Sequence, residues 1–296
     1  MIKTDFKKEL RNLFGPPSKD FVLVTVPELN FLMVDGMGDP GTAQSYADAA
    51  AALYSVSYTL KFASKKDLEH DYVVFVGQQV QLPNGMWVNG SACSGVLVAP
   101  TVVLTAAHCT LLPPPLSSFP QRAVVRQGEN FMAPEAAAIG TYVLHPGFCI
   151  GCAGAPEGFA NNDLAVVVLS SPLSGPYANL PKLGFAGKHF DDKEKKLVAV
   201  GYGLSAPGTG LGTRRSAQAG AIVASNAPNF LFLPVPSKKK YGTVCGGDSG
   251  GAALVGNTLV AIHSIGDDAC GGPSYAYRLD TPDAQSFLSK YLDVRG

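Results

Sequence analysis

The sequence of 296 residues contains little charge. Only 16% of its residues are Asp, Glu, Lys or Arg, and 23 basic residues balance 23 acidic ones. A neutral chain has no overall field that attracts polyanions, so we expect neither nucleic acid nor an anionic membrane as a partner. The chain also lacks an apolar run of the roughly 18 residues that a membrane helix needs. It has a single tryptophan, Trp87, and no cysteine before Cys93.

Glycine and proline are abundant, with 33 and 22 residues, and 46% of the chain is hydrophobic. The hydrophobic content excludes general disorder. A turn-rich chain of this length favours a mainly β protein with many tight connections.

The charge is unevenly distributed. Residues 1–70 contain 8 basic and 9 acidic residues, whereas the other 226 contain only 15 and 14. All six cysteines lie in this second part, which indicates disulfides and an oxidising compartment. The first residues, MIKTDFKKELRNLF, do not resemble a signal peptide. Either the export signal is missing from this chain, or the cysteines stay reduced.

The pattern of apolar residues also changes near residue 70. Residues 21–26 and 31–34 read as strands, and residues 43–62 as a helix whose apolar face includes Ala49 and Leu53. Short strands with frequent turn residues follow from residue 71, which is typical of an antiparallel sandwich or barrel. Near the end, Thr281 and Pro282 have the residue types of a helix N-cap and first turn. The expected strands here are 71–76, 95–98, 102–105, 165–169, 197–200, 220–223 and 258–263.

Three short motifs carry chemistry. They are LTAAHC at 104–109, NDLA at 162–165 and CGGDSGG at 245–251. A serine hydroxyl needs an adjacent base to become a nucleophile, and an imidazole titrates near neutral pH. A carboxylate orients that imidazole, and glycines let backbone N–H groups approach an oxyanion. Each residue alone also fits an ordinary loop, but their order favours a catalytic triad.

With these motifs, residues 71–296 resemble the trypsin-like serine proteases of the chymotrypsin fold. The resemblance implies a mainly β fold of two antiparallel β-barrels, dividing near residues 175–185, with a C-terminal helix. A small α+β segment precedes it. It further implies peptide hydrolysis through an acyl-enzyme, without metal or cofactor. The implied roles are general base for His108, orienting acid for Asp163, nucleophile for Ser249, and oxyanion hole for the N–H groups of Gly247 and Ser249.

The same resemblance suggests where a substrate binds. The segment Ser264–Gly266 matches the strand that pairs with the substrate backbone. Thr243 occupies the base of the primary pocket, followed by Val244, and Gly266 leaves one wall open with Ser274 near the other. Without an acid at the base, we expect cleavage after small to medium uncharged residues. Alternatively, Asp267 and Asp268 attract cationic side chains.

The cysteines fall into two groups. The resemblance implies a disulfide between Cys93 and Cys109, and another between Cys245 and Cys270. Cys149 and Cys152 lie outside the common pattern. A short local disulfide is favoured for them, with free thiols or a metal site that includes His145 as alternatives.

The sequence departs from the family at the activation step. In a zymogen of this family, cleavage creates an Ile-Val-Gly-Gly-like N-terminus whose ammonium reaches the acid before the nucleophile, here Asp248. No such motif precedes the first strand, and Val73–Gly77 lacks the double glycine. Asp248 therefore has no obvious cation partner, and a buried unpaired charge is costly. The alternative function is a latent or non-catalytic protease-like module that binds partners.

Residues 1–70 resemble a different family. DFKKEL, VPELNFLMVDGMGDPG and ALYSVSYTLKFASKK are similar to the start of the gyrase-inhibitor-like small-molecule-binding domain. Less than half of such a domain is present, so no ligand-binding residue is expected here. The segment covers part of the protease, or a fusion joined two unrelated pieces. By family and cysteine pattern, we expect a secreted or periplasmic monomer that acts on polypeptides.

Overall fold

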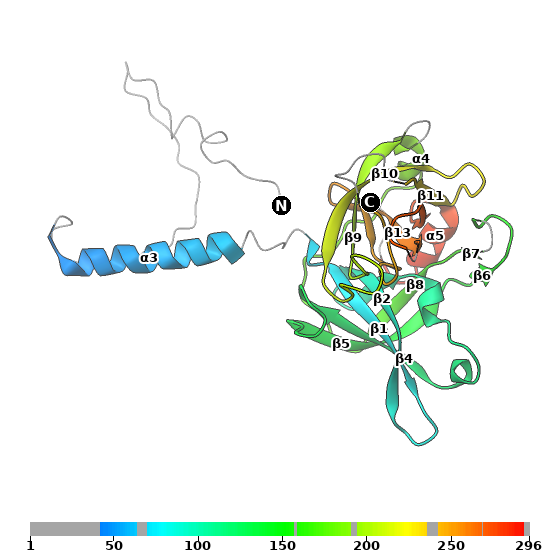
Figure 1. The fold of residues 1–296 in the computed structure, drawn as a ribbon, viewed down its shortest axis with the longest axis horizontal. Coiled ribbons are helices and arrows are strands. Elements are labelled where there is room, and N and C mark those ends of the chain that lie inside the picture. The colour runs from blue at the N-terminus through cyan, green and yellow to red at the C-terminus, as the bar shows by residue number, and fades with distance from the viewer. Residues whose placement is uncertain are drawn as a thin grey trace, which may run out of the picture. The chain divides into compact units, whose positions relative to one another are not determined.

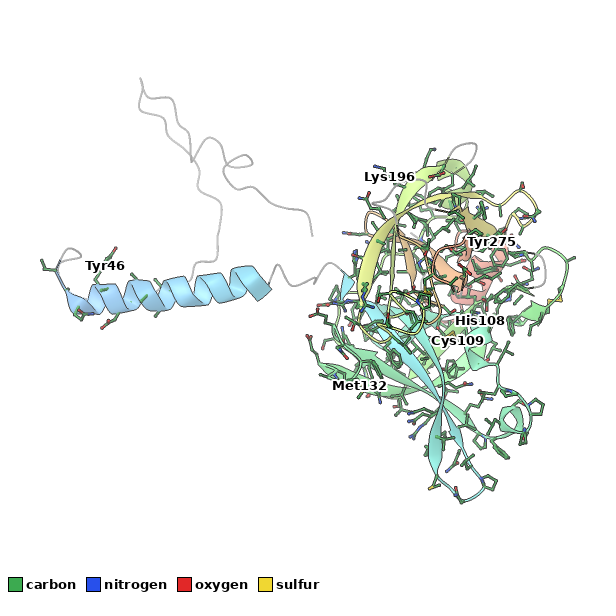
Figure 2. The ribbon with its side chains drawn as sticks, in the orientation of Figure 1. Tyr46, His108, Cys109, Met132, Lys196 and Tyr275 are labelled. Carbon is green, nitrogen blue, oxygen red and sulfur yellow. A yellow bond between two sulfur atoms is a disulfide. The ribbon has the colours of Figure 1, made fainter. Side chains whose placement is uncertain are left out.

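The computed structural model describes residues 42–63, 70–156, 159–190, 194–235, 242–267 and 269–292. The chain divides into two units, Met1–Glu69 and His70–Gly296. In the first unit, helix α3 spans Gln44–Ala63, close to the predicted 43–62. Tyr46, labelled in Figure 2, is 55% exposed, and Ala49 and Leu53 are half-buried. The predicted strands at 21–26 and 31–34 lie outside the described residues.

Six strands of the second unit close into a first antiparallel barrel, coloured cyan to green in Figure 1. Their order around the barrel is β1-β2-β3-β8-β5-β4. The bounds are Val73–Gln81 for β1, Trp87–Ala99 for β2, Val102–Thr105 for β3, Gln121–Gln127 for β4, Ala136–Leu144 for β5 and Ala165–Leu169 for β8.

A second closed antiparallel barrel follows, with the order β10-β11-β14-β13-β12-β9. The prediction of a mainly β fold with two antiparallel barrels is therefore confirmed. Its strands are Lys195–Gly201 (β9), Arg215–Val223 (β10), Phe230–Leu233 (β11), Ala252–Val255 (β12), Thr258–Ile265 (β13) and Ser274–Arg278 (β14).

Small residues allow the first barrel to close around its β-branched core. At Gly95, an added Cβ would lie 2.6 Å from Val76 Cγ2 and 2.8 Å from Val103 Cγ1. The side chains of Val76, Val103 and Leu104 are fully buried in the resulting interior. A larger residue at position 95 would separate the strands, because a packed core has no space for it.

The two barrels are joined by a buried tyrosine. Tyr202 follows β9, and its hydroxyl donates hydrogen bonds to the backbone carbonyls of Val73, at 3.2 Å, and Gly128. Its ring packs edge-to-face on Phe75, with centroids 6.0 Å apart. Burying this ring with its hydroxyl bonded fixes β9 against the first barrel.

The C-terminal helix α5 spans Pro282–Leu288 and begins as predicted. Thr281 is its N-cap, and the Thr281 hydroxyl accepts the N–H of Ala284 at 3.3 Å. The regular helix ends at Leu288, and the chain continues as turns. The other short elements are η2 (Ala107–Thr110), η3 (Leu116–Ser118), β6 (Cys149–Ile150), β7 (Ala160–Asn161) and α4 (Phe185–His189).

Among the residues that the structure describes, no helix has both the length and the hydropathy to cross a bilayer.

Candidate active site

His108 and Asp163 form a hydrogen-bonded pair. His108 lies on η2, directly after strand β3, and Asp163 lies two residues before β8. The ring Nδ1 of His108 is 2.7 Å from Asp163 Oδ2, and the His108 backbone N–H donates to Asp163 Oδ1 at 2.8 Å. Asp163 is fully buried, so its carboxylate holds the ring in one orientation and leaves Nε2 as the only ring nitrogen for other partners.

Neighbouring side chains fix this pair further. The Ser264 hydroxyl, from β13 of the second barrel, donates to Asp163 Oδ2 at 2.6 Å. The ring of Phe159 packs edge-on against the His108 ring, with centroids 5.4 Å apart. The Tyr277 hydroxyl donates to Asn162 Oδ1 at 2.8 Å, which holds the turn before Asp163. Both barrels therefore position the histidine–aspartate pair.

The turn that carries Ser249 packs closely on the first barrel. Gly250 has φ = +80°, and an added Cβ would lie 2.3 Å from Thr105 Oγ1 and 2.8 Å from the Ala106 nitrogen. The backbone N–H of Ser94 donates to the Ser249 carbonyl at 2.8 Å. Only glycine fits this left-handed contact, and it brings the Ser249 backbone beside η2. The Ser249 carbonyl oxygen lies 3.9 Å from the Sγ of Cys109, the residue after His108.

The peptide group before Gly247 has a fixed direction. The Leu204 N–H donates to the Gly246 carbonyl at 2.9 Å, and the Ser94 hydroxyl donates to the Gly247 carbonyl at 2.8 Å. In a planar trans peptide the N–H points opposite to the C=O. The Gly247 N–H therefore points away from Leu204, and Gly247 reaches this arrangement with φ = +94°.

Asp248 is half-buried, and both of its carboxylate oxygens accept backbone hydrogen bonds. Gly203 N–H donates to Oδ1 at 2.8 Å, and Cys245 N–H donates to Oδ2 at 3.0 Å. Burial raises the pKa of Asp248, while these two hydrogen bonds and the positive charge of Arg215 oppose that rise. Nothing in the sequence marked Arg215 as a neighbour of this acid, because no spacing rule links a strand residue to it.

A cavity of about 490 Å³ lies beside Asp248. Thr243 and Val244, both predicted pocket residues, line it together with His263 and Arg215. The Thr243 hydroxyl donates to the Cys270 carbonyl at 2.8 Å. The predicted residues Ser264 and Gly266 are not part of this lining, so the structure does not bring all the predicted substrate-binding residues to one cavity.

Gly266, predicted to leave one wall of the primary pocket open, lies close to the segment that follows Thr243 at the predicted base. A Cβ added at Gly266 would lie 2.9 Å from the Val244 carbonyl oxygen and 3.4 Å from the Cys245 Cα. Only glycine therefore fits at position 266 without a shift of the neighbouring backbone. Asp267, proposed as an attractant for cations, is half-buried, and its pKa is lowered by hydrogen bonds from the N–H groups of Gly271, Ala269 and Gly272. Asp268 lies outside the described residues.

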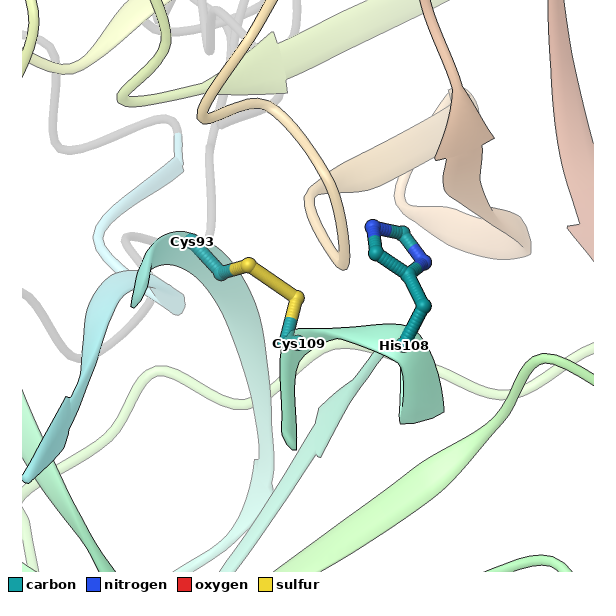
Figure 3. A group of neighbouring side chains, drawn as sticks. All are labelled: Cys93, His108 and Cys109. Atoms are coloured by element: carbon teal, nitrogen blue, oxygen red, sulfur yellow. A yellow bond between two sulfur atoms is a disulfide. The ribbon is translucent and has the colours of Figure 1, made fainter. Parts of the chain in front are cut away.

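The six cysteines form three disulfides. Cys93 pairs with Cys109, Cys245 with Cys270, and Cys149 with Cys152. The first joins β2 to η2 immediately beside His108, as Figure 3 shows. Cys93, Cys109 and His108 bring possible metal-ligand atoms within 4.8 Å of one another, but sulfurs in a disulfide are not thiolate ligands.

Two closed barrels, with the histidine–aspartate pair on one and the GDSGG turn on the other, define the class of two-barrel serine proteases. The model of the family described as trypsin matches residues 75–286. The chain belongs to this trypsin family.

Individual relatives are distant. The chain is 27% identical over 217 residues to a trypsin of Saccharopolyspora erythraea, an alignment that covers 68% of this chain and 84% of the relative. It is 26% identical over 205 residues to the vitellin-degrading protease of Bombyx mori, covering 64% and 72%. Neuropsin, a serine protease expressed in the limbic system of mouse brain, has the same fold, with a TM-score of 0.54, 18% identity and coverage of 76% and 96%.

Proposed function

We propose that the protein is a serine endopeptidase in which His108, Asp163 and Ser249 act as the catalytic triad. The observation that carries the proposal is the short contact of 2.7 Å between His108 Nδ1 and the fully buried Asp163 carboxylate. With Nδ1 occupied, Nε2 is left to take the proton of the Ser249 hydroxyl as it attacks a carbonyl carbon. His108 then returns this proton to the leaving amine, and water hydrolyses the acyl-enzyme in the same way.

The oxyanion of the tetrahedral intermediate would be bound by the N–H groups of Gly247 and Ser249. The fixed direction of the Gly246–Gly247 peptide supports this role, because such donors stabilise charge only when they are already oriented. The substrate backbone would pair with Ser264–Gly266. The side chain before the cleaved bond would contact Thr243 and Val244, with small to medium uncharged residues preferred.

The chemistry of this site needs neither a metal nor a cofactor, and its substrate would be a polypeptide. We further propose that the protein is secreted or periplasmic, because disulfides persist in oxidising compartments, and that it acts as a monomer. Residues 1–70 would be an appendage that resembles the gyrase-inhibitor-like domain and is not required for catalysis.

One observation favours the second candidate, a latent protease-like module. The backbone at Gly266 lies so close to the Val244 carbonyl that a Cβ would not fit there, which narrows the slot that a substrate side chain would enter. Cleavage would then require that the Ser264–Gly266 segment move away from Val244. A form in which this segment does not move would keep the triad without cutting peptides.

Two reagents separate these candidates. A small labelled fluorophosphonate reacts with an activated serine and needs no side-chain pocket, whereas a panel of peptide substrates also needs an open slot. We expect labelling and peptide cleavage in the wild type, with both abolished in Ser249→Ala. Labelling without cleavage would support the latent module. If the folded wild-type protein were not labelled, the triad assignment would be wrong.

A further inference from the structure

The loop of residues 203–213 lies between β9 and β10. Two of its backbone N–H groups donate hydrogen bonds to residues 246–248, next to Ser249. Gly203 N–H donates to the Asp248 carboxylate at 2.8 Å, and Leu204 N–H donates to the Gly246 carbonyl at 2.9 Å. The second bond sets the direction of the Gly247 N–H, as described above. The position of this loop therefore determines whether an oxyanion donor points toward the substrate.

Arg215 holds this loop by its carbonyl groups. Its Nη1 donates to the Gly210 carbonyl at 2.6 Å and to those of Gly203 and Thr213, both at 3.3 Å. Three carbonyls from the start, middle and end of the loop thus converge on one guanidinium. Gly210 has φ = +83°, and an added Cβ there would lie 3.0 Å from Arg215 Nη2, so the loop is closely folded around this side chain.

Arg215 is also well placed to act on Asp248. It is the first residue of β10 and pairs with Gly201 on β9. A Cβ at Gly201 would lie only 2.2 Å from Asp248 Oδ1, so the strand pair abuts the carboxylate. Arg215 and Asp248 line the same cavity, and the positive charge of Arg215 favours the ionised carboxylate.

We propose that Arg215 is a positioning residue that keeps the oxyanion donor in place, by fixing loop 203–213 against Asp248 and Gly246. This role rests on the proposed function for its effect on catalysis. In the family, the ammonium of a cleaved N-terminus supports the acid before the nucleophile. Here the side chain of Arg215 would give that support to Asp248. Arg215 touches neither substrate nor the reacting atoms, so it acts only through the loop.

The test compares Arg215→Gln with Arg122→Gln in the full-length protein. Arg122 is the matched control, because it is also a β-strand arginine, but its guanidinium lies over Trp87 and donates to Gln79 in the first barrel. We expect Arg215→Gln to lower kcat for a peptide substrate at least tenfold with KM changed less than threefold. The rate of fluorophosphonate labelling should fall in parallel, because both reactions need the oxyanion hole.

Chemical rescue distinguishes positioning from general stability. Low concentrations of guanidinium ion should raise the activity of Arg215→Ala at least threefold. The Arg215 side chain is exposed, so its removal leaves a site that guanidinium can reach. Arg215→Lys should retain more activity than Arg215→Gln, since it keeps the charge. No rescue, or an Arg215→Gln variant within twofold of wild type, would overturn the proposal.

A second measurement does not depend on activity. Amide hydrogen exchange at residues 203–213 and 246–249 should accelerate at least tenfold in Arg215→Gln and stay unchanged in Arg122→Gln. Unchanged exchange in both variants would overturn the inference even if the wild type labels at Ser249. If exchange accelerates in Arg215→Gln but the wild-type protein is never labelled at Ser249, the structural role of Arg215 would be supported and the proposed function refuted.

Discussion

Asp163 accepts three hydrogen bonds: from the ring and the backbone N–H of His108, and from the Ser264 hydroxyl. An amide at this position can accept at only one of its two terminal atoms. Asp163→Asn should therefore let the His108 ring take the wrong tautomer while the fold is kept.

We expect Asp163→Asn to lower kcat about 10⁴-fold, the size of effect measured for this change in a serine protease triad. Steady-state hydrolysis of a peptide substrate measures it. Asp283→Asn is the matched control, because Asp283 is an exposed acid in the first turn of α5. An Asp163→Asn variant that loses less than tenfold would show that this carboxylate does not orient the base.

His263 is a buried histidine that the proposed mechanism does not use. It is 1% exposed, and neither ring nitrogen has a hydrogen-bond partner among the described residues. Burial lowers its pKa from 6.5 to about 4, although the backbone of Ala252 partly opposes this. The folded protein therefore holds this ring neutral where the unfolded chain protonates it.

The free energy of unfolding should depend on pH for this reason. The unfolded state binds one more proton than the native state between about pH 6.5 and 4, so the stability is complete above pH 6.5 and is lost as the pH falls. The loss should approach about 3 kcal/mol near pH 4. Urea unfolding at several pH values measures this dependence.

His263→Leu should reduce that pH dependence and raise the stability at low pH, because an unpaired buried polar group is removed. His189→Leu, which removes a half-exposed histidine of α4, is the matched control. An unchanged slope in His263→Leu would show that this ring does not titrate with folding.

At the scale of elements, helix α5 depends on its N-cap. The Thr281 hydroxyl accepts the Ala284 N–H, and the helix buries Phe287 and Leu288 in the core. Thr281→Ala should lower the free energy of unfolding by about 1 kcal/mol, because one N–H is left without its partner. Thr281→Ser keeps the hydroxyl and should lose less than half as much. Denaturant titration compares the two, and equal losses would contradict the capping role.

The elements that sequence predicted well have strong local signals. Strands β3 and β8 begin and end where predicted, because short runs of valine and leucine are flanked by turn residues. The cap of α5 was predicted from Thr281 and Pro282. By contrast, only the last four of the nine residues of β10 were predicted, since RSAQA has no apolar pattern and is held by its pairing with β9.

The residues of the candidate site also divide into those with a local sequence signal and those without one. The motifs around His108, Asp163 and Ser249 were visible because their chemistry constrains neighbouring residues. The contacts of Phe159 with His108, and of Arg215 with loop 203–213, join residues far apart in sequence. No local pattern marks such contacts, so sequence alone did not predict them.

At the scale of the whole molecule, the second unit contains all the residues assigned to the candidate site. Both barrels close within residues 73–278, and all three disulfides lie in this unit. We predict that a chain of residues 70–296 folds and is labelled by a fluorophosphonate within twofold of the full-length rate. Circular dichroism and labelling of both chains measure this. A truncated chain that folds but labels more than tenfold slower would show that residues 1–69 take part in the activity.

Ser94 links the first barrel both to the second barrel and to the turn that carries Ser249. This one residue of β2 binds the carbonyls of Ser249 and Gly247, and its hydroxyl accepts the Tyr202 N–H at 2.9 Å. Ser94 thus holds both the contact between the two barrels and the turn that carries Ser249. We therefore expect a slight separation of the barrels to release the turn, so that labelling of Ser249 by a fluorophosphonate would be lost before either barrel unfolds. Such labelling would then report how tightly the two barrels are closed on each other.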